Sequence, residues 1–145
     1  MNSISHRSFS FITLFLALIF LFSACASSAV NIPDNLSPAE LVQRAQEASD
    51  RNRYNTALQY YEALLERYSY NINMVCTAEY EIAFIHYKQK KYTEARTGFN
   101  NLLERYNTPD AELLPQQFKR LSMIVLERMD EKEKSKVSLF KSKKE

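Results

Sequence analysis

Two cysteines and two histidines are the side chains with the readiest nucleophilic chemistry in this sequence of 145 residues. A thiolate is a far better nucleophile than a hydroxyl, so each cysteine is a candidate for covalent chemistry. Cys25 directly follows a long apolar run, whereas Cys76 lies in the interior of the chain. Cys76 near a helix start would have a lowered pKa, but the pattern favours a buried structural thiol. No Ser, Cys or acid pair is placed around His86 to form a catalytic relay, which favours a packing role.

The residues before Cys25 have the order of a secretory signal peptide. A basic amino-terminal region without acidic residues precedes an apolar run over residues 11–22, and two small residues separate this run from the cysteine. This pattern predicts a signal peptide over residues 1–24. The run is shorter than the roughly 20 residues that cross a membrane. Two alternatives stay open: an uncleaved anchor over residues 9–26, and ordinary cleavage that leaves Cys25 as a thiol.

The stretch LFSAC over residues 21–25 resembles a bacterial lipobox. In a lipobox the cysteine thiol receives a diacylglycerol through a thioether bond and becomes the new amino terminus. The resemblance implies that Cys25 is the lipid-attachment residue and that acyl chains hold the protein on a membrane. Ala26 follows the cysteine, where an Asp would imply the inner membrane, so the periplasmic face of the outer membrane is implied. Residues 25–36 would then be a lipidated N-terminus and flexible tether.

Composition favours an all-α protein that binds no nucleic acid. The chain has one Gly and four Pro among many helix-forming residues, which disfavours a sheet with many turns. Its 19 Lys and Arg nearly balance its 17 Asp and Glu, so no strong field attracts nucleic acid. The sequence has no Gly-rich phosphate loop and no paired metal-ligand spacing. We therefore expect neither an enzyme nor a bound metal or cofactor.

An internal repeat with an offset of 38 residues organises the predicted helical domain, residues 37–129. Residues 53–68 (RYNTALQYYEALLERY) and 91–106 (KYTEARTGFNNLLERY) share a Tyr, an Ala and the run LLERY at matching positions. Apolar residues recur at steps of three and four in both segments, which predicts one amphipathic helix in each. A further helix precedes each segment, at about residues 38–50 and 74–89, so the sequence predicts two helical hairpins.

Small residues allow the two helices of each hairpin to approach closely. Ala45 and Ala83 lie 12 residues before Ala57 and Ala95, so we expect alanine to face alanine across each hairpin. Gly98 falls inside a helix at a cost of about 1 kcal/mol relative to alanine. It indicates either close contact with another backbone or simple tolerance.

Start signals and apolar spacing set the ends of the domain. Ser37 and Glu40 form a capping box, with a proline between them at the first helical position, so organised structure should begin there. After Pro115 an apolar-periodic run predicts a C-terminal helix that covers the open end of the second hairpin. Residues 130–145 are heavily charged and are expected to be a frayed last helix or a mobile tail.

The alternation of helices resembles the tetratricopeptide repeat (TPR). The resemblance implies a short TPR-like α-solenoid of two hairpins and a capping helix, whose first helices line a concave surface that binds an extended peptide or helix of a partner. Carried over by position, the groove residues are Val42, Gln46 and Ser49 in the first hairpin and Tyr80, Phe84, Tyr87 and Lys88 in the second. For the three aromatic residues, core packing is the open alternative.

With its lipobox, its repeat spacing and its LLERY motif, the chain resembles the BamD-type TPR lipoproteins, which act in outer-membrane protein assembly. The resemblance covers residues 37–129 and implies a membrane-anchored periplasmic scaffold with envelope or outer-membrane proteins as partners. One alternative is a pilotin-like lipoprotein that escorts a secretion or pilus subunit. Another is a transporter accessory that binds a small hydrophobic ligand. Because fewer than three complete repeats bury little core, a partner or self-association would help to hold the fold.

Overall fold

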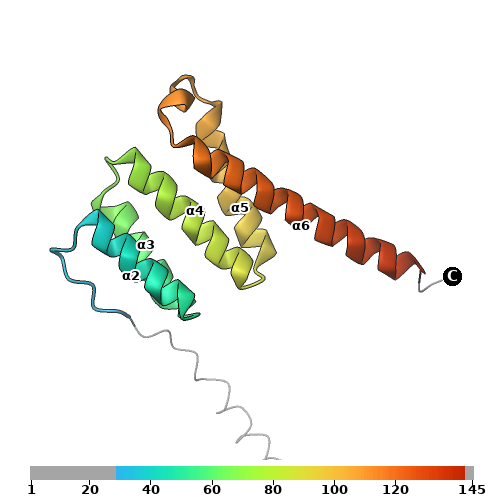
Figure 1. The fold of residues 1–145 in the computed structure, drawn as a ribbon, viewed down its shortest axis with the longest axis horizontal. Helices are drawn as coiled ribbons and strands as arrows, with labels where there is room; N and C mark the ends of the chain where they lie inside the picture. Colours follow the sequence, from blue (N-terminus) through green and yellow to red (C-terminus); the bar gives the residue numbers. More distant parts are fainter. Residues whose placement is uncertain (1–28, 143–145) are drawn as a thin grey trace, which may run out of the picture.

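The computed structural model describes residues 29–142 and consists there of helices without strands (Figure 1). The helices are α2 (Pro38–Asp50), α3 (Tyr54–Arg67), α4 (Ile72–Lys88), α5 (Tyr92–Glu104) and α6 (Gln116–Ser142), with two short 3-10 helices, η1 (Arg105–Asn107) and η2 (Pro109–Leu113), before α6. The predicted all-α fold of two helical hairpins and a C-terminal capping helix is therefore confirmed. Cys25 lies outside the described residues.

The helices stack in two layers. Helices α2 and α3 form the first hairpin, α4 and α5 form the second, α3 packs on α4, and α6 packs mainly on α5. Figure 1 shows α2, α4 and α6 on the near side and α3 and α5 behind them. One core joins α2, α3 and α4, and a second joins α4, α5 and α6. The near layer is thus one surface built from three helices, which we call the α2–α4–α6 face.

Alanines hold each hairpin together at close range. Ala45 and Ala57 are fully buried in the first core, and Ala83 and Ala95 are fully buried in the second, as the sequence predicts. Gly98 shows how close α4 and α5 come, because a Cβ atom built on it would lie 2.8 Å from the Cβ of Ala83. Of the two explanations for this glycine, close contact is the one that the structure supports.

Each hairpin reverses through a residue with positive φ. These residues are Asn52 (φ 57°) and Lys90 (φ 62°), which are one repeat offset apart. In the first turn, the N–H groups of Asn52 and Arg53 donate to the carbonyls of Ser49 and Ala48 at 3.0 and 2.8 Å. The second turn repeats this pair of hydrogen bonds. Both are Schellman motifs, which satisfy the last carbonyls of a helix and reverse the chain.

The chain before α2 is packed against the first hairpin. In place of the flexible tether expected over residues 25–36, residues 30–36 form what we call the N-terminal strap. The Arg67 guanidinium donates to the carbonyl of Pro33 at 2.8 Å, and Val30 donates its N–H to a glutamine side chain of α3 at 2.7 Å. The capping box follows at once and is confirmed at α2. Hydrogen bonds to residues about 30 positions later in the sequence therefore hold this segment in place, although its composition alone indicates a flexible tether.

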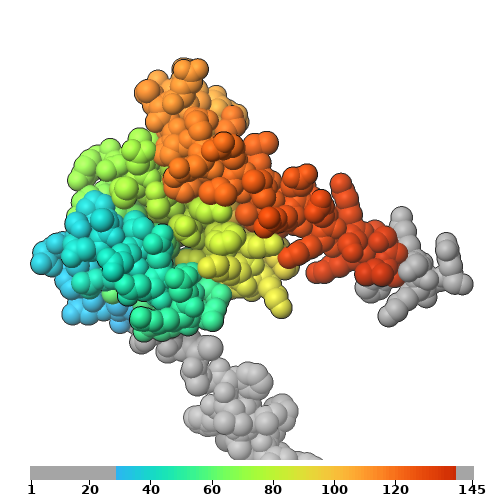
Figure 2. Space-filling view, viewed as in Figure 1, coloured from blue at the N-terminus to red at the C-terminus, as the bar shows by residue number. Residues whose placement is uncertain are grey.

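Helix α6 continues past the end expected from apolar spacing. Of the apolar run that predicts this helix, Phe118, Val125 and Met129 are buried against the second hairpin, whereas Leu121 and Ile124 are 40% and 44% exposed. Every described residue from 130 to 139 is exposed. The helix nevertheless runs on to Ser142, so no break separates a domain ending at 129 from a tail. Figure 2 shows this last part projecting from the body of the molecule. Within the described residues, no helix is both long and apolar enough to cross a membrane.

Candidate partner-binding face and the α5–α6 pocket

A row of aromatic rings runs along α4 and on to the start of α5. Tyr80, Phe84 and Tyr87 share one side of α4 because their spacing follows the helical turn. The ring centroids of successive members lie 5.8 and 5.9 Å apart, and Tyr92 continues the series 5.9 Å from Tyr87. These separations are typical of favourable aromatic pairs. We call these four residues the aromatic row.

The aromatic row is partly core and partly surface. Tyr80 is only 7% exposed, and its ring also contacts those of Phe99 and Phe118. Phe84 and Tyr87 are half-buried. The question of groove or core therefore has a different answer for each residue: Tyr80 packs between α4, α5 and α6, whereas Phe84 and Tyr87 keep part of their surface open to a partner.

Three lysines lie over the rings of the aromatic row. Lys88 Nζ is 5.2 Å from the Phe84 ring centre, Lys132 Nζ is 5.2 Å from that of Tyr87, and Lys136 Nζ is 5.8 Å from that of Tyr92. Lys132 also donates to the Tyr87 hydroxyl at 3.1 Å, and this hydrogen bond raises the pKa of the lysine. We call these three residues the lysine row. Its members make the open part of the aromatic row cationic.

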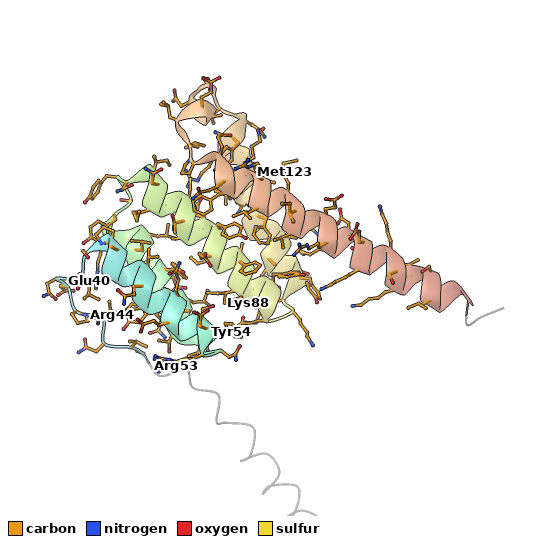
Figure 3. All side chains as sticks on the ribbon, viewed as in Figure 1. Glu40, Arg44, Arg53, Tyr54, Lys88 and Met123 are labelled. Atoms are coloured by element: carbon orange, nitrogen blue, oxygen red, sulfur yellow. The ribbon has the colours of Figure 1, made fainter. Side chains whose placement is uncertain are left out.

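The first hairpin contributes less to this face than its positions imply. Gln46 is exposed, Val42 is half-buried against the first core, and Ser49 is buried. Ser49 nevertheless meets the second hairpin, because its hydroxyl accepts a hydrogen bond from Lys88 Nζ at 3.2 Å. Lys88 thus lies at the carboxyl end of α4 beside α2 (Figure 3). The structure brings Ser49, Lys88 and Phe84 together, and Gln46 is exposed one helical turn before Ser49 on α2.

A buried polar group lies beneath the same face. Burial, and after it the Glu81 and Asp50 carboxylates, raises the pKa of Tyr61. Burial likewise raises the pKa of Glu81, while the nearby Lys88 opposes that shift. Among the described residues the Tyr61 hydroxyl has no hydrogen-bond partner. Sequence reasoning gave Tyr61 only a packing role, because the electrostatic effect of Glu81 arises from the next hairpin and is not visible in either helix alone.

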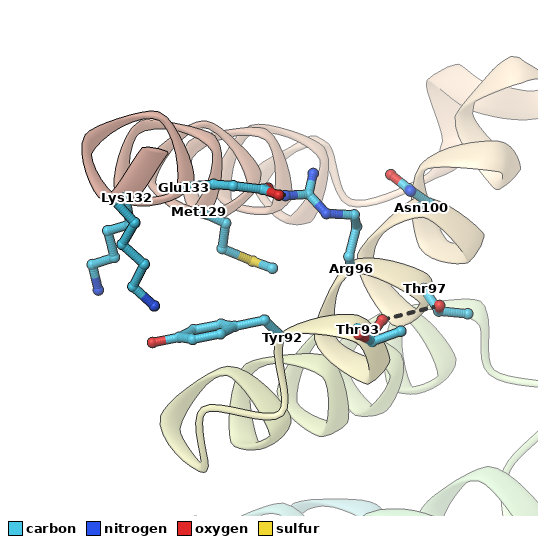
Figure 4. Close-up of a pocket in the computed structure, with 9 residues that line it drawn as sticks. Tyr92, Thr93, Arg96, Thr97, Asn100, Met129, Lys132 and Glu133 are labelled. Atoms are coloured by element: carbon cyan, nitrogen blue, oxygen red, sulfur yellow. Dashed lines mark hydrogen bonds and ion pairs between the residues drawn. The ribbon is translucent and has the colours of Figure 1, made fainter. Parts of the chain in front are cut away.

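A second feature missed by sequence reasoning is a pocket of about 490 Å³ between α5 and α6 (Figure 4). It is lined by Tyr92, Thr93, Arg96, Thr97, Asn100, Met129, Lys132, Glu133 and Lys136. The pocket exists because α6 continues as a helix past Met129 while diverging from α5. If residues 130–145 were a mobile tail, the pocket would lack the wall that Lys132, Glu133 and Lys136 form.

The surroundings of Cys76 and His86 favour packing roles for both side chains. Cys76 is fully buried, and burial together with the nearby Glu79 carboxylate raises the pKa of its thiol. This is the opposite of what a reactive thiolate needs. His86 is half-buried, and its Nδ1 atom has no partner within the part of the chain that the structure describes. Over residues 29–142, no three His, Cys, Asp or Glu side chains gather closely enough to hold a metal ion.

Comparison with known proteins finds a relative that matches most of this chain. The chain is 34% identical over 113 residues to an uncharacterised protein of Treponema pallidum (strain Nichols). The matched region is 77% of this chain and 45% of that protein, so the chain spans less than half of the relative's length. No family model matches the chain, and no solved structure matches it.

Proposed function

We propose that this chain is a lipid-anchored envelope protein whose α2–α4–α6 face binds a segment of a partner protein. The observation that carries the proposal is the pairing of half-buried aromatic rings with lysines on this face. Phe84 and Tyr87 offer flat apolar area, and Lys88 and Lys132 place a cation over each ring. Aromatic side chains are enriched in protein interfaces because a rigid ring buries much area at low entropic cost.

The cellular setting of the proposal rests on sequence patterns. The apolar run and the LFSAC stretch support export and lipidation at Cys25, and the TPR-like repeat supports a scaffold without catalysis. By its likeness to BamD-type lipoproteins, the partner is an envelope or outer-membrane protein and the location is the periplasmic face of the outer membrane. A stack of two hairpins offers a short surface, which suits one helix or one extended segment of a partner.

Site-specific photocrosslinking in the native envelope tests the proposal. A photoreactive residue in place of Gln46, which is exposed on α2, should give discrete crosslinked species. The matched control replaces Glu62, which is exposed on α3 in the other layer, and should give none. Adding Lys88→Gln to the Gln46 variant should weaken the crosslinks, because this lysine lies on the same face. Equal crosslinking from Gln46 and Glu62 would contradict the proposal.

A further inference from the structure

We propose that the α5–α6 pocket binds an extended acidic segment of a partner protein. The proposal deepens the proposed function and rests on it, because it names a place and a chemistry for part of the partner. Three properties of the pocket carry it: a polar wall on α5, a cationic wall on α6, and an aromatic and thioether base between them.

The polar wall comes from one side of α5. Thr93, Thr97 and Asn100 follow one another at steps of four and three, so their side chains lie along one helix face. The Thr97 hydroxyl donates to the carbonyl of Thr93 at 3.0 Å, which leaves its oxygen lone pairs able to accept. Such side chains can pair with the N–H and C=O groups of an extended chain. The wall therefore suits a peptide backbone.

The cationic wall comes from the projecting half of α6. Lys132 and Lys136 are four residues apart and lie over the rings of Tyr87 and Tyr92. Tyr92 forms part of the base together with Met129, which is 4% exposed. Figure 4 shows Tyr92 and Lys132 at one end of the pocket and Asn100 toward the other.

Charge pairing inside the pocket leaves the two lysines available. Arg96 is neutralised by Asp130 at 2.7 Å and more distantly by Glu133 at 3.7 Å. Neither Lys132 nor Lys136 has a carboxylate within 4 Å among the described residues. A ligand that brings two carboxylates would supply the missing counter-charges through charge-assisted hydrogen bonds.

An acidic protein segment fits these walls better than an anionic membrane surface does. A flat layer of lipid headgroups would reach the projecting lysines, but it would not pair with Thr93 and Asn100 along the cleft between the helices. The volume lies within the range of ordinary ligand sites. Because the lysines are exposed, we expect moderate affinity that weakens steeply as salt is added.

Titration of fluorescein-labelled hexaglutamate against the full chain in an uncharged detergent tests the proposal, with hexaglutamine as the uncharged probe. Hexaglutamate should bind and hexaglutamine should not. The Lys132→Gln/Lys136→Gln variant should bind about tenfold more weakly, since two exposed charge pairs are lost. The matched control is Lys119→Gln/Lys134→Gln, which removes two α6 lysines outside the pocket, one of them also over an aromatic ring. Its affinity should stay within about twofold.

Thr93→Val separates a built pocket from general attraction to a basic surface. Valine keeps the shape of threonine and changes no charge, so weaker binding of hexaglutamate by this variant supports pairing along α5. The proposal is overturned if hexaglutamate does not bind, or if both lysine double variants lose affinity equally. It is also overturned if vesicles of phosphatidylglycerol bind through Lys132 and Lys136 while hexaglutamate does not, because the site would then belong to lipid.

These outcomes are distinguishable from failure of the proposed function. Crosslinking from Gln46 reports contact at the α2–α4–α6 face in the envelope, whereas the titration reports the pocket and involves neither Gln46 nor Lys88. Crosslinked partners without hexaglutamate binding would remove the pocket proposal only. Hexaglutamate binding without crosslinks would locate partner contact at the pocket and overturn the assignment of the face.

Discussion

At the scale of single residues, the absence of a side chain at Gly98 allows α4 and α5 to pack closely. Gly98 has no Cβ, and the space that a Cβ would occupy is already filled by the Cβ of Ala83 at 2.8 Å. Alanine would favour the helix by about 1 kcal/mol over glycine, yet overpacking of a close helix contact costs about 1–3 kcal/mol. The second effect should win, because the obstructing atom is attached directly to a backbone and cannot swing away.

We therefore expect Gly98→Ala to lower the free energy of unfolding by about 1 kcal/mol. The measurement is urea unfolding followed by circular dichroism. The matched control is the exchange of the two residues, Ala83→Gly with Gly98→Ala, which removes the clash and should recover part of the loss. A more stable Gly98→Ala variant would show that α4 and α5 can separate without cost.

At the scale of elements, the two hairpin turns use the same geometry with different residues. Asn52 tolerates positive φ better than most residues, whereas Lys90 adopts the same conformation with a long side chain. A left-handed residue other than Gly costs about 1–2 kcal/mol. The second turn is therefore the less favourable of the two.

Lys90→Gly should accordingly stabilise the fold by about 0.5–1 kcal/mol, since part of the gain is offset by the freedom of glycine in the unfolded chain. Gln89→Gly is the matched control, because Gln89 precedes the same turn and has an ordinary φ of −74°. It should give no gain. Thermal and urea midpoints of both variants measure the difference, and an equal shift in the two would mean that backbone conformation at Lys90 is not the cause.

Local signals predicted some elements well and others only in part. The capping box starts α2 at Pro38, and the helix ends at Asp50, as expected. Helix α4 begins two residues before the expected start, because the Asn71 side chain caps it by accepting the N–H of Met74. Residues 130–145 were expected to be either a frayed helix or a tail, and the structure has helix as far as Ser142. Burial stops at Met129, but charged residues without Gly or Pro continue the backbone hydrogen bonds.

The candidate site was predicted to the extent that it follows repeat positions. The spacing of Tyr80, Phe84 and Tyr87 identified the aromatic row, and their shared helix face needs no tertiary information. Lys132 and Lys136 were beyond reach, since they meet the row only through the course of α6. Whether an aromatic residue is core or surface depends on what packs beside it, as Phe118 does beside Tyr80.

At the scale of the whole molecule, both ends of the stack bear on function. The N-terminal strap closes one side of the first hairpin, while the outer side of α6 leaves Met123 and Ile124 about half exposed, at 55% and 44%. Figure 3 shows Met123 on α6, with no further helix beside it among the described residues. The strap and the exposed apolar residues of α6 therefore lie at opposite ends of the stack of hairpins.

Lipid attachment is tested on the whole protein in its own cell. Metabolic labelling with palmitate should mark the chain and place it in the envelope fraction, because a diacylated cysteine holds a protein firmly on a bilayer. Cys25→Ser should lose the label and the membrane association. Cys76→Ser, the matched control, should keep both, since its thiol is fully buried. Label that persists without Cys25, or is absent from the natural chain, would contradict the lipoprotein assignment.

The packed strap has a mechanical consequence for an anchored protein. The Val30 N–H is hydrogen-bonded to a side chain of α3, and five residue steps separate Val30 from Cys25, which a fully extended chain would span in about 17 Å. If Cys25 is acylated, a connecting segment of this length would keep the domain at a nearly fixed height above the lipid and would restrict its rotation. Partners would then be met within a thin zone next to the bilayer rather than across the width of the compartment.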